Sequence, residues 1–121
     1  MEWTAEQTRD AAQRRLKKEA ARQAALADRR ESARAHAREL AQEIAAADPS
    51  VVRIWGFGST FDHRLRFSES SDIDLAVEGG SLTAWKIAER SSWKVDWVEL
   101  DDQDRSMVNA IISDGVLLYE R

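Results

Sequence analysis

One continuous stretch decides the fold of this chain: residues 58–77, which read GSTFDHRLRFSESSDIDLAV. It opens with Gly58-Ser59, directly after an apolar run at residues 51–57 that predicts a strand. It closes on Asp72-Ile73-Asp74-Leu75, where polar and apolar residues alternate as in a second strand over residues 72–77. The stretch therefore joins a glycine turn to a pair of acids on one strand.

The glycine turn has two interpretations. Gly56 and Gly58 let the backbone bend sharply and approach a ligand closely. Amides at the start of a helical turn, expected over residues 59–63, suit a phosphate group, and Ser59 adds a hydroxyl donor. A tight strand-to-helix turn without a ligand explains the same residues. The motif alone leaves both interpretations open.

The two aspartates form the second motif. Because side chains alternate along a strand, Asp72 and Asp74 are expected on one face, opposite the apolar residues between and after them. Neighbouring carboxylates repel each other unless a cation lies between them, and oxygen ligands of this kind suit Mg²⁺. The alternative is a half-buried strand with a solvated acidic face.

A third acid follows in a later strand. Asp96 interrupts the apolar pattern expected to form a strand over residues 94–100. If that strand lies beside residues 72–77, Asp96 joins the other two acids, and a shared metal would explain a charged group in a sheet. An edge position facing water is the alternative.

The N-terminal region differs in composition from the rest. Residues 4–47 are rich in Ala, Arg, Glu and Gln and contain no Gly or Pro, so they predict one long helix, with a break near Asp28 as a variant. Thr4 is a plausible N-cap with Gln7 as its partner, and Pro49 ends the helix. We therefore divide the chain into a helical segment, residues 1–48, and a second domain, residues 49–121.

The second domain alternates strands and helices. Beyond the elements above, helices are expected over residues 81–90 and 102–113, capped by Ser81 and by Asp101 or Asp102, and a last strand over residues 116–119. This pattern predicts an α/β or α+β fold, in which helices flank a small mixed sheet.

Composition excludes several function classes. The chain has no cysteine and two histidines, which removes disulfides, thiolate metal sites and a histidine-rich zinc site. Residues 1–46 hold ten Lys and Arg against eight Asp and Glu, whereas residues 47–121 hold eight against fourteen. So acidic a second domain makes nucleic-acid binding unexpected. No apolar run is long enough to span a membrane, and a cytoplasmic protein is expected.

The glycine turn, the Asp72 and Asp74 pair and Asp96 together form a specific pattern. A strand, a Gly-Ser turn, twelve intervening residues, an Asp-x-Asp strand, a helix and a strand bearing Asp96 follow in that order. The chain thereby resembles the minimal nucleotidyltransferases of the DNA polymerase β-like superfamily, over about residues 51–120. The resemblance implies a polymerase β palm-like fold with the long N-terminal helix as an addition.

The resemblance also assigns site residues. It implies that Asp72, Asp74 and Asp96 are catalytic and bind Mg²⁺, with Asp96 also as general base. It implies that the phosphates of a nucleoside triphosphate contact the turn and the loop after it. The nucleotide-binding candidates are Gly58, Ser59, Thr60, Arg64 and Arg66. Thr60 departs from the family pattern, in which many relatives have an arginine after the Gly-Ser.

Relatives of this size act as the antitoxin of a two-gene module. The resemblance implies transfer of AMP from ATP to a tyrosine of a helical HEPN-type toxin, as in type VII-like toxin–antitoxin systems. The alternatives are nucleotidyl transfer to a small hydroxyl compound, as in antibiotic-modifying relatives, and an inert binding module of the same fold. The alanine-rich helix is a candidate docking arm for the partner or a site of self-association.

Overall fold

The computed structural model describes residues 2–121 of the chain. Each expected element is present, and no end differs from its expected position by more than three residues. In chain order they are α1 (Ala5–Ala47), β1 (Val51–Phe57), the 3₁₀ turn η1 (Gly58–Thr60), β2 (Ile73–Gly79), α2 (Leu82–Glu89), β3 (Val95–Glu99), the 3₁₀ turn η2 (Leu100–Asp102), α3 (Arg105–Asp114) and β4 (Val116–Glu120).

The four strands form one mixed sheet in the order β3-β2-β1-β4. β1 pairs antiparallel with β2 on one side and with β4 on the other, while β2 and β3 are parallel. Only the β2-α2-β3 unit of the described chain therefore has the parallel crossover that alternating strands and helices suggest. The expected α+β fold with a small mixed sheet is confirmed.

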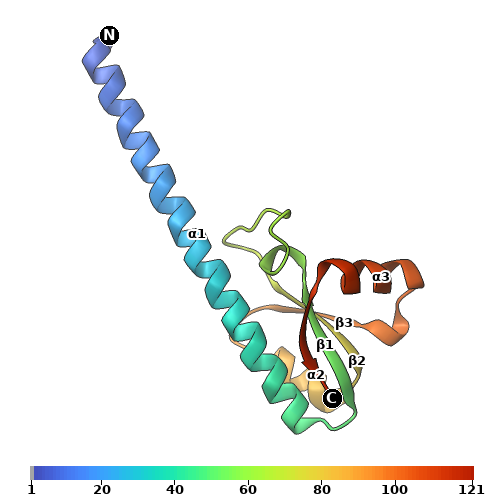
Figure 1. Cartoon of the computed structure of the whole chain (residues 1–121). Helices are drawn as coiled ribbons and strands as arrows, with labels where there is room; N and C mark the ends of the chain where they lie inside the picture. The colour runs from blue at the N-terminus through green and yellow to red at the C-terminus, as the bar shows by residue number, and fades with distance from the viewer. Residues whose placement is uncertain (1) are drawn as a thin grey trace.

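Helix α1 is continuous through Asp28, so the variant with a break there is wrong. Its N-terminus has the expected capping box: the Thr4 hydroxyl accepts from the Gln7 amide at 3.1 Å, and the Gln7 side chain accepts from the Thr4 amide at 2.8 Å. The C-terminal half packs on the sheet, whereas the N-terminal half extends well beyond the body of the protein (Figure 1). No helix within residues 2–121 is long and apolar enough to cross a membrane.

The sheet has two differently covered faces. On one face, apolar side chains of β1 and β2 pack against α1 and α2 in the main core. The buried residues of this core include Ile44, Ile54, Ile73, Leu75 and Val77. On the other face, Ala76, Leu100 and Ile111 form a smaller cluster beneath α3. Alternation along β2 therefore places Asp74 on the α3 face, because its neighbours Ile73 and Leu75 face α1.

Asp48 joins three elements at the end of α1. Its buried carboxylate accepts hydrogen bonds from the amide and hydroxyl of Ser50 and from the amide and hydroxyl of Ser81. The Ala84 amide, in the first turn of α2, adds a longer contact of 3.3 Å. These donors stabilise the carboxylate and hold the pKa of Asp48 well below its usual value. Asp48 thereby fixes how α1, β1 and α2 meet.

One expected helix cap is wrong. Helix α3 is capped by Asp104, whose side chain accepts from the Met107 amide at 2.8 Å, and not by Asp101 or Asp102. Those two residues belong to η2, and the Asp101 carboxylate accepts instead from the amide of Gly79. Ser81, by contrast, caps α2 as expected.

Candidate active site

Asp74 and Asp96 occupy matching positions on two neighbouring strands. In the parallel pairing of β2 with β3, Asp74 is in register with Asp96. Strands paired in this way lie about 4.8 Å apart, and residues in register point to the same face. That face is the one that carries Ala76 and α3. The site predicted from the sequence requires these two strands to be neighbours, and they are.

The Asp96 carboxylate is close enough to Asp74 to change the ionisation of Asp74. The pKa of Asp74 is raised to about 7, first by burial and then by the charge of Asp96 and a hydrogen bond between the two groups. The charge of Asp72 contributes in the same direction. Besides burial, the shift therefore reflects repulsion from two neighbouring carboxylates.

Asp72 lies just before β2 and has a basic partner. Its carboxylate forms an ion pair of 3.6 Å with Lys94, the residue before β3. Within residues 2–121, no cluster of three or more acidic, histidine or cysteine side chains is arranged as a metal site. The structure thus brings together Asp74 and Asp96, while Asp72 adds its charge from the rim. Lys94 was not anticipated, since a single lysine before a strand carries no sequence signal.

Gly58 brings the backbone of the turn onto the carboxylate. Its φ is +71°, in the left-handed region that glycine adopts readily. A Cβ built at this position would overlap Oδ2 of Asp74. The cause is the β1–β2 register, in which Phe57 pairs with Asp74, so the next residue passes beside the carboxylate. Ser59 follows in η1 and is half-buried.

Thr60 has a different position from the one expected of a nucleotide contact. Its side chain is fully buried, and its hydroxyl donates to the backbone carbonyl of Asp72 at 3.1 Å. The hydroxyl therefore ties η1 to the start of β2 and is not free to contact a ligand. This bond therefore stabilises the backbone next to the candidate site.

The two arginines of the loop, Arg64 and Arg66, have different surroundings. Arg64 forms a bidentate pair with Asp62 and a second ion pair of 3.0 Å with Asp114 at the end of α3. The hydrogen bonds from Arg64 lower the pKa of Asp62 to about 2. Arg66 lies on the α1 side of the loop, in a cleft described below. Of these two arginines, Arg64 is therefore the one directed toward the α3 face.

The loop between η1 and β2 is fastened to α1 by two arginines that sequence reasoning missed. Arg30 donates to the Asp62 carbonyl at 2.7 Å, and Arg34 donates to the Thr60 carbonyl at 2.6 Å. The spacing of four residues, which puts both arginines on one side of a helix, was the available signal. Through these bonds α1 fixes the loop that carries Arg64.

Comparisons with known proteins agree with this geometry. A scan against protein-family models and a search of curated proteins found no match. Among solved structures, a toxin–antitoxin complex with AMP-PNP matches with a TM-score of 0.56 and 20% identity, over 69% of this chain and 73% of that chain. The MntA–HpeT toxin–antitoxin mutant matches with a TM-score of 0.50 and 21% identity, over 69% of each chain.

This chain shares its fold with these two toxin–antitoxin structures. A complex of the tri-AMPylated Shewanella oneidensis HEPN toxin with its MNT antitoxin is also similar, with a TM-score of 0.49, 20% identity, and coverage of 76% of this chain and 73% of that one. At such identities the likeness to these solved structures is one of fold. Within this fold, the Asp74–Asp96 pair and the Gly58 turn are the chemically distinctive features.

Proposed function

We propose that this chain is a Mg²⁺-dependent nucleotidyltransferase that moves AMP from ATP to a hydroxyl group of another protein, a tyrosine of a HEPN-type toxin. The observation that carries the proposal is the Asp74–Asp96 carboxylate pair, held in register against the backbone of Gly58. The shared fold supports it, because one of the similar toxin–antitoxin structures holds the ATP analogue AMP-PNP.

The donor set fits the proposed metal. Carboxylate oxygens are the ligands that Mg²⁺ prefers, and the charge that raises the pKa of Asp74 is what a bound cation would neutralise. Asp74 and Asp96 would hold the ion, and Asp72 would join them by leaving Lys94. Bound there, Mg²⁺ would offset the charge of the triphosphate and lower the pKa of the attacking hydroxyl.

The proposed reaction is a single displacement at phosphorus. The acceptor oxygen forms a bond to the α-phosphorus of ATP, the bond from that phosphorus to the bridging oxygen of the β-phosphate breaks, and pyrophosphate leaves. The proton of the acceptor hydroxyl passes to a carboxylate, and Asp96 is the exposed member of the pair, open to an incoming group. The turn at Gly58 and Ser59, with Arg64 beside it, would position the phosphates.

A separate acceptor chain is consistent with how the site is built. The carboxylates lie near the beginning of β2 and β3, and Asp96 is exposed, so no other part of the described chain covers it. The residues of the sheet domain are occupied in forming its core and leave little material for binding an acceptor. A second protein therefore has access to the site from solvent.

The decisive experiment follows the two ends of ATP. The purified chain is incubated with Mg²⁺, a HEPN-type toxin as the candidate partner, and ATP labelled on either the α- or the γ-phosphate. We expect the α-label alone on the partner, and mass spectrometry should place AMP on a tyrosine. Asp74→Asn should abolish labelling, whereas Glu89→Gln, an exposed change in α2 on the opposite face of the sheet, should not.

Two results would argue for other functions. Labelling of a small hydroxyl compound but not of the partner would favour a small-molecule transferase. Binding of ATP with no transfer to any acceptor, by a protein that also binds the partner, would favour an inert module of the same fold.

A further inference from the structure

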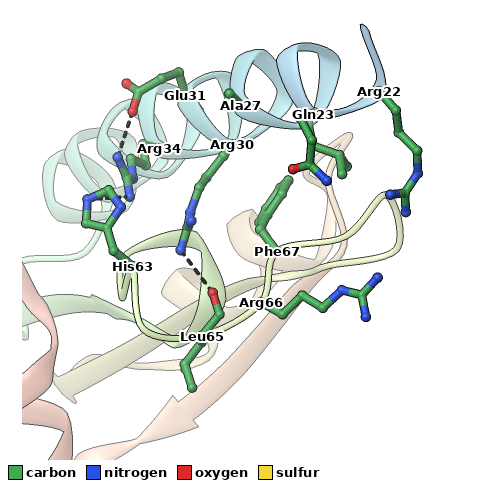
Figure 2. Close-up of a pocket in the computed structure, with 11 residues that line it drawn as sticks. Arg22, Gln23, Ala27, Arg30, Glu31, Arg34, His63, Leu65, Arg66 and Phe67 are labelled. Atoms are coloured by element: carbon green, nitrogen blue, oxygen red, sulfur yellow. Dashed lines mark hydrogen bonds and ion pairs between the residues drawn. The ribbon is translucent and has the colours of Figure 1, made fainter. Parts of the chain in front are cut away.

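A cleft separates α1 from the loop that follows η1. It has a volume of about 440 Å³. Among its described lining residues, the charged ones are predominantly basic (Figure 2). The polar and aromatic residues that matter here are Arg22, Arg30, Arg34, His63, Arg66 and Phe67. A hollow of this size accommodates a small molecule or a short segment of a chain.

The cleft lies on the opposite side of the sheet from the carboxylate pair. Helix α1 and Phe67 belong to the main core, whereas Asp74 and Asp96 share the face that carries α3. The loop between residues 60 and 72 divides the two regions: Arg64 faces Asp114 of α3, and Arg66 faces α1. The cleft is therefore a separate place on the molecule.

Among the described residues, two of the four arginines that line the cleft have no ion-pair partner. Among the described lining residues, Glu31 is the one carboxylate, and it pairs with Arg34 at 2.7 Å. Arg22 has a partner outside the cleft, Glu19, at 3.5 Å. Within residues 2–121, no carboxylate lies within ion-pair distance of Arg66 or Arg30.

Arg30 has an unsatisfied buried donor and a neighbour of like charge. Its Nε is buried and has no hydrogen-bond partner among the described residues, although Nη2 donates to the Asp62 carbonyl. Burial and the neighbouring charge of Arg34 both lower the pKa of Arg30. Its guanidinium lies over the ring of Phe67, with 5.7 Å from Cζ to the ring centroid. A bound anion would relieve the repulsion between the two arginines.

We propose that this cleft is a second anion-binding site, which takes a phosphate-bearing ligand. Several guanidinium groups facing one hollow offer paired N–H donors, and a phosphate group has the charge and the three or more acceptor oxygens to use them. Figure 2 shows Arg22 from α1 and Arg66 from the loop at one end of the hollow, with Arg30 and Arg34 toward the other. The ligand therefore spans α1 and the loop.

Two sources of phosphate fit this chemistry: a free pyrophosphate or nucleotide, and the backbone of single-stranded RNA. Arg15, Lys18 and Arg22 lie three and four residues apart, so they share a face of the exposed arm and extend the basic surface beyond the cleft. A longer ligand would use this extension and a short one would not.

The test measures binding without divalent metal, which keeps it independent of the proposed catalysis. Calorimetry and amide chemical shifts are recorded on the full chain in EDTA with inorganic pyrophosphate, with a single-stranded RNA oligonucleotide, and with a polyglutamate peptide. We expect pyrophosphate to shift the amides of Arg30, Arg34 and residues 63–67, with little change at Gly58 or Asp74.

Variants then locate the site. Arg66→Gln and Arg22→Gln, both exposed and away from the core, should each weaken pyrophosphate binding roughly tenfold, as expected when a charge-assisted contact is lost. Arg38→Gln, an exposed change on the same helix, should have no effect. If RNA binds more tightly than pyrophosphate, with a steep salt dependence that Lys18→Gln reduces, the phosphate source is nucleic acid.

Several outcomes would overturn the proposal. One is that shifts appear at Gly58 and Asp74 in place of the cleft. Another is equal affinity in the wild type, Arg22→Gln and Arg66→Gln. Binding of polyglutamate without binding of either phosphate ligand would show that the cleft receives an acidic protein segment.

Discussion

The carboxylate of Asp74 lies against the backbone of Gly58. It occupies the space that any side chain at position 58 would need. The Gly-Ser turn and the Asp-x-Asp strand, twelve residues apart in sequence, are therefore one structural unit. The relationship predicts that position 58 controls the site through Asp74.

Gly58→Ala should abolish Mg²⁺-dependent ATP binding, because the new methyl group displaces the Asp74 carboxylate. It should also destabilise the fold by about 1–2 kcal/mol, the usual cost of a non-glycine residue at positive φ. Gly80→Ala is a matched control, since Gly80 has a φ of +87° but contacts Val51, Val77 and Ala84. Calorimetric titration of both variants checks this. Normal ATP binding by Gly58→Ala would disprove the link.

Asp74→Asn should eliminate nucleotidyl transfer and leave the fold intact. The amide has the shape of the carboxylate but loses the charge that would hold the metal. In metal-free protein the variant should be more stable than the wild type by up to about 1 kcal/mol, because repulsion from Asp96 and Asp72 is removed. Urea unfolding in EDTA measures the second effect. Transfer activity retained by this variant would show that the metal site is assigned wrongly.

The stability of the metal-free protein should fall as pH rises from about 4 to about 7. The folded pKa of Asp74 is raised to about 7, above the unfolded value of 3.8, so in this window the folded state binds a proton that the unfolded state has released. Because Asp74 is partly exposed, solvent screening limits the effect to about 1–2 kcal/mol. Asp74→Asn should remove this slope, and saturating Mg²⁺ should flatten it. An identical slope in the variant would contradict the assignment.

Asp48 should have the opposite pH dependence. Its folded pKa is depressed by hydrogen bonds from Ser50 and Ser81, so its contribution is present above the unfolded pKa near 4 and is lost as pH falls below it. Asp48→Asn replaces a buried acceptor of several hydrogen bonds and should destabilise the protein by about 2–3 kcal/mol at pH 7. Denaturant unfolding of both proteins from pH 7 to pH 3 should show their difference shrinking. A constant difference would mean that packing, and not ionisation, sets the loss.

The exposed arm of α1 should exchange its amide hydrogens quickly in the isolated chain. Side chains between Thr4 and Ala25 are exposed, apart from Ala11, whereas Ala33, Ala37 and Ile44 are buried against the body. A helix without tertiary contacts depends on its own cooperativity, so protection should drop toward the N-terminus. Hydrogen exchange with and without the partner, together with the oligomeric state, checks this. Slow exchange along the whole arm in a proven monomer would remove the basis for a docking or self-associating role.

The sequence by itself determined most of the element pattern. Apolar runs marked β1 and β3, and apolar alternation marked β2. Thr4 and Gln7 marked the start of α1, and Ser81 marked that of α2. These signals are local, since each depends on residues within one or two turns or on a single strand. The cap of α3 was missed because three neighbouring aspartates, Asp101, Asp102 and Asp104, offer the same side chain to the backbone.

Only the tertiary structure decided which of these residues meet. The register of β2 with β3 pairs Asp74 with Asp96, and Asp72 forms an ion pair with Lys94. Burial of Thr60 removed it from the nucleotide contacts, and the loop path separated Arg64 from Arg66. Strand order, register and loop path are set by packing between residues distant in sequence, which motif spacing does not encode.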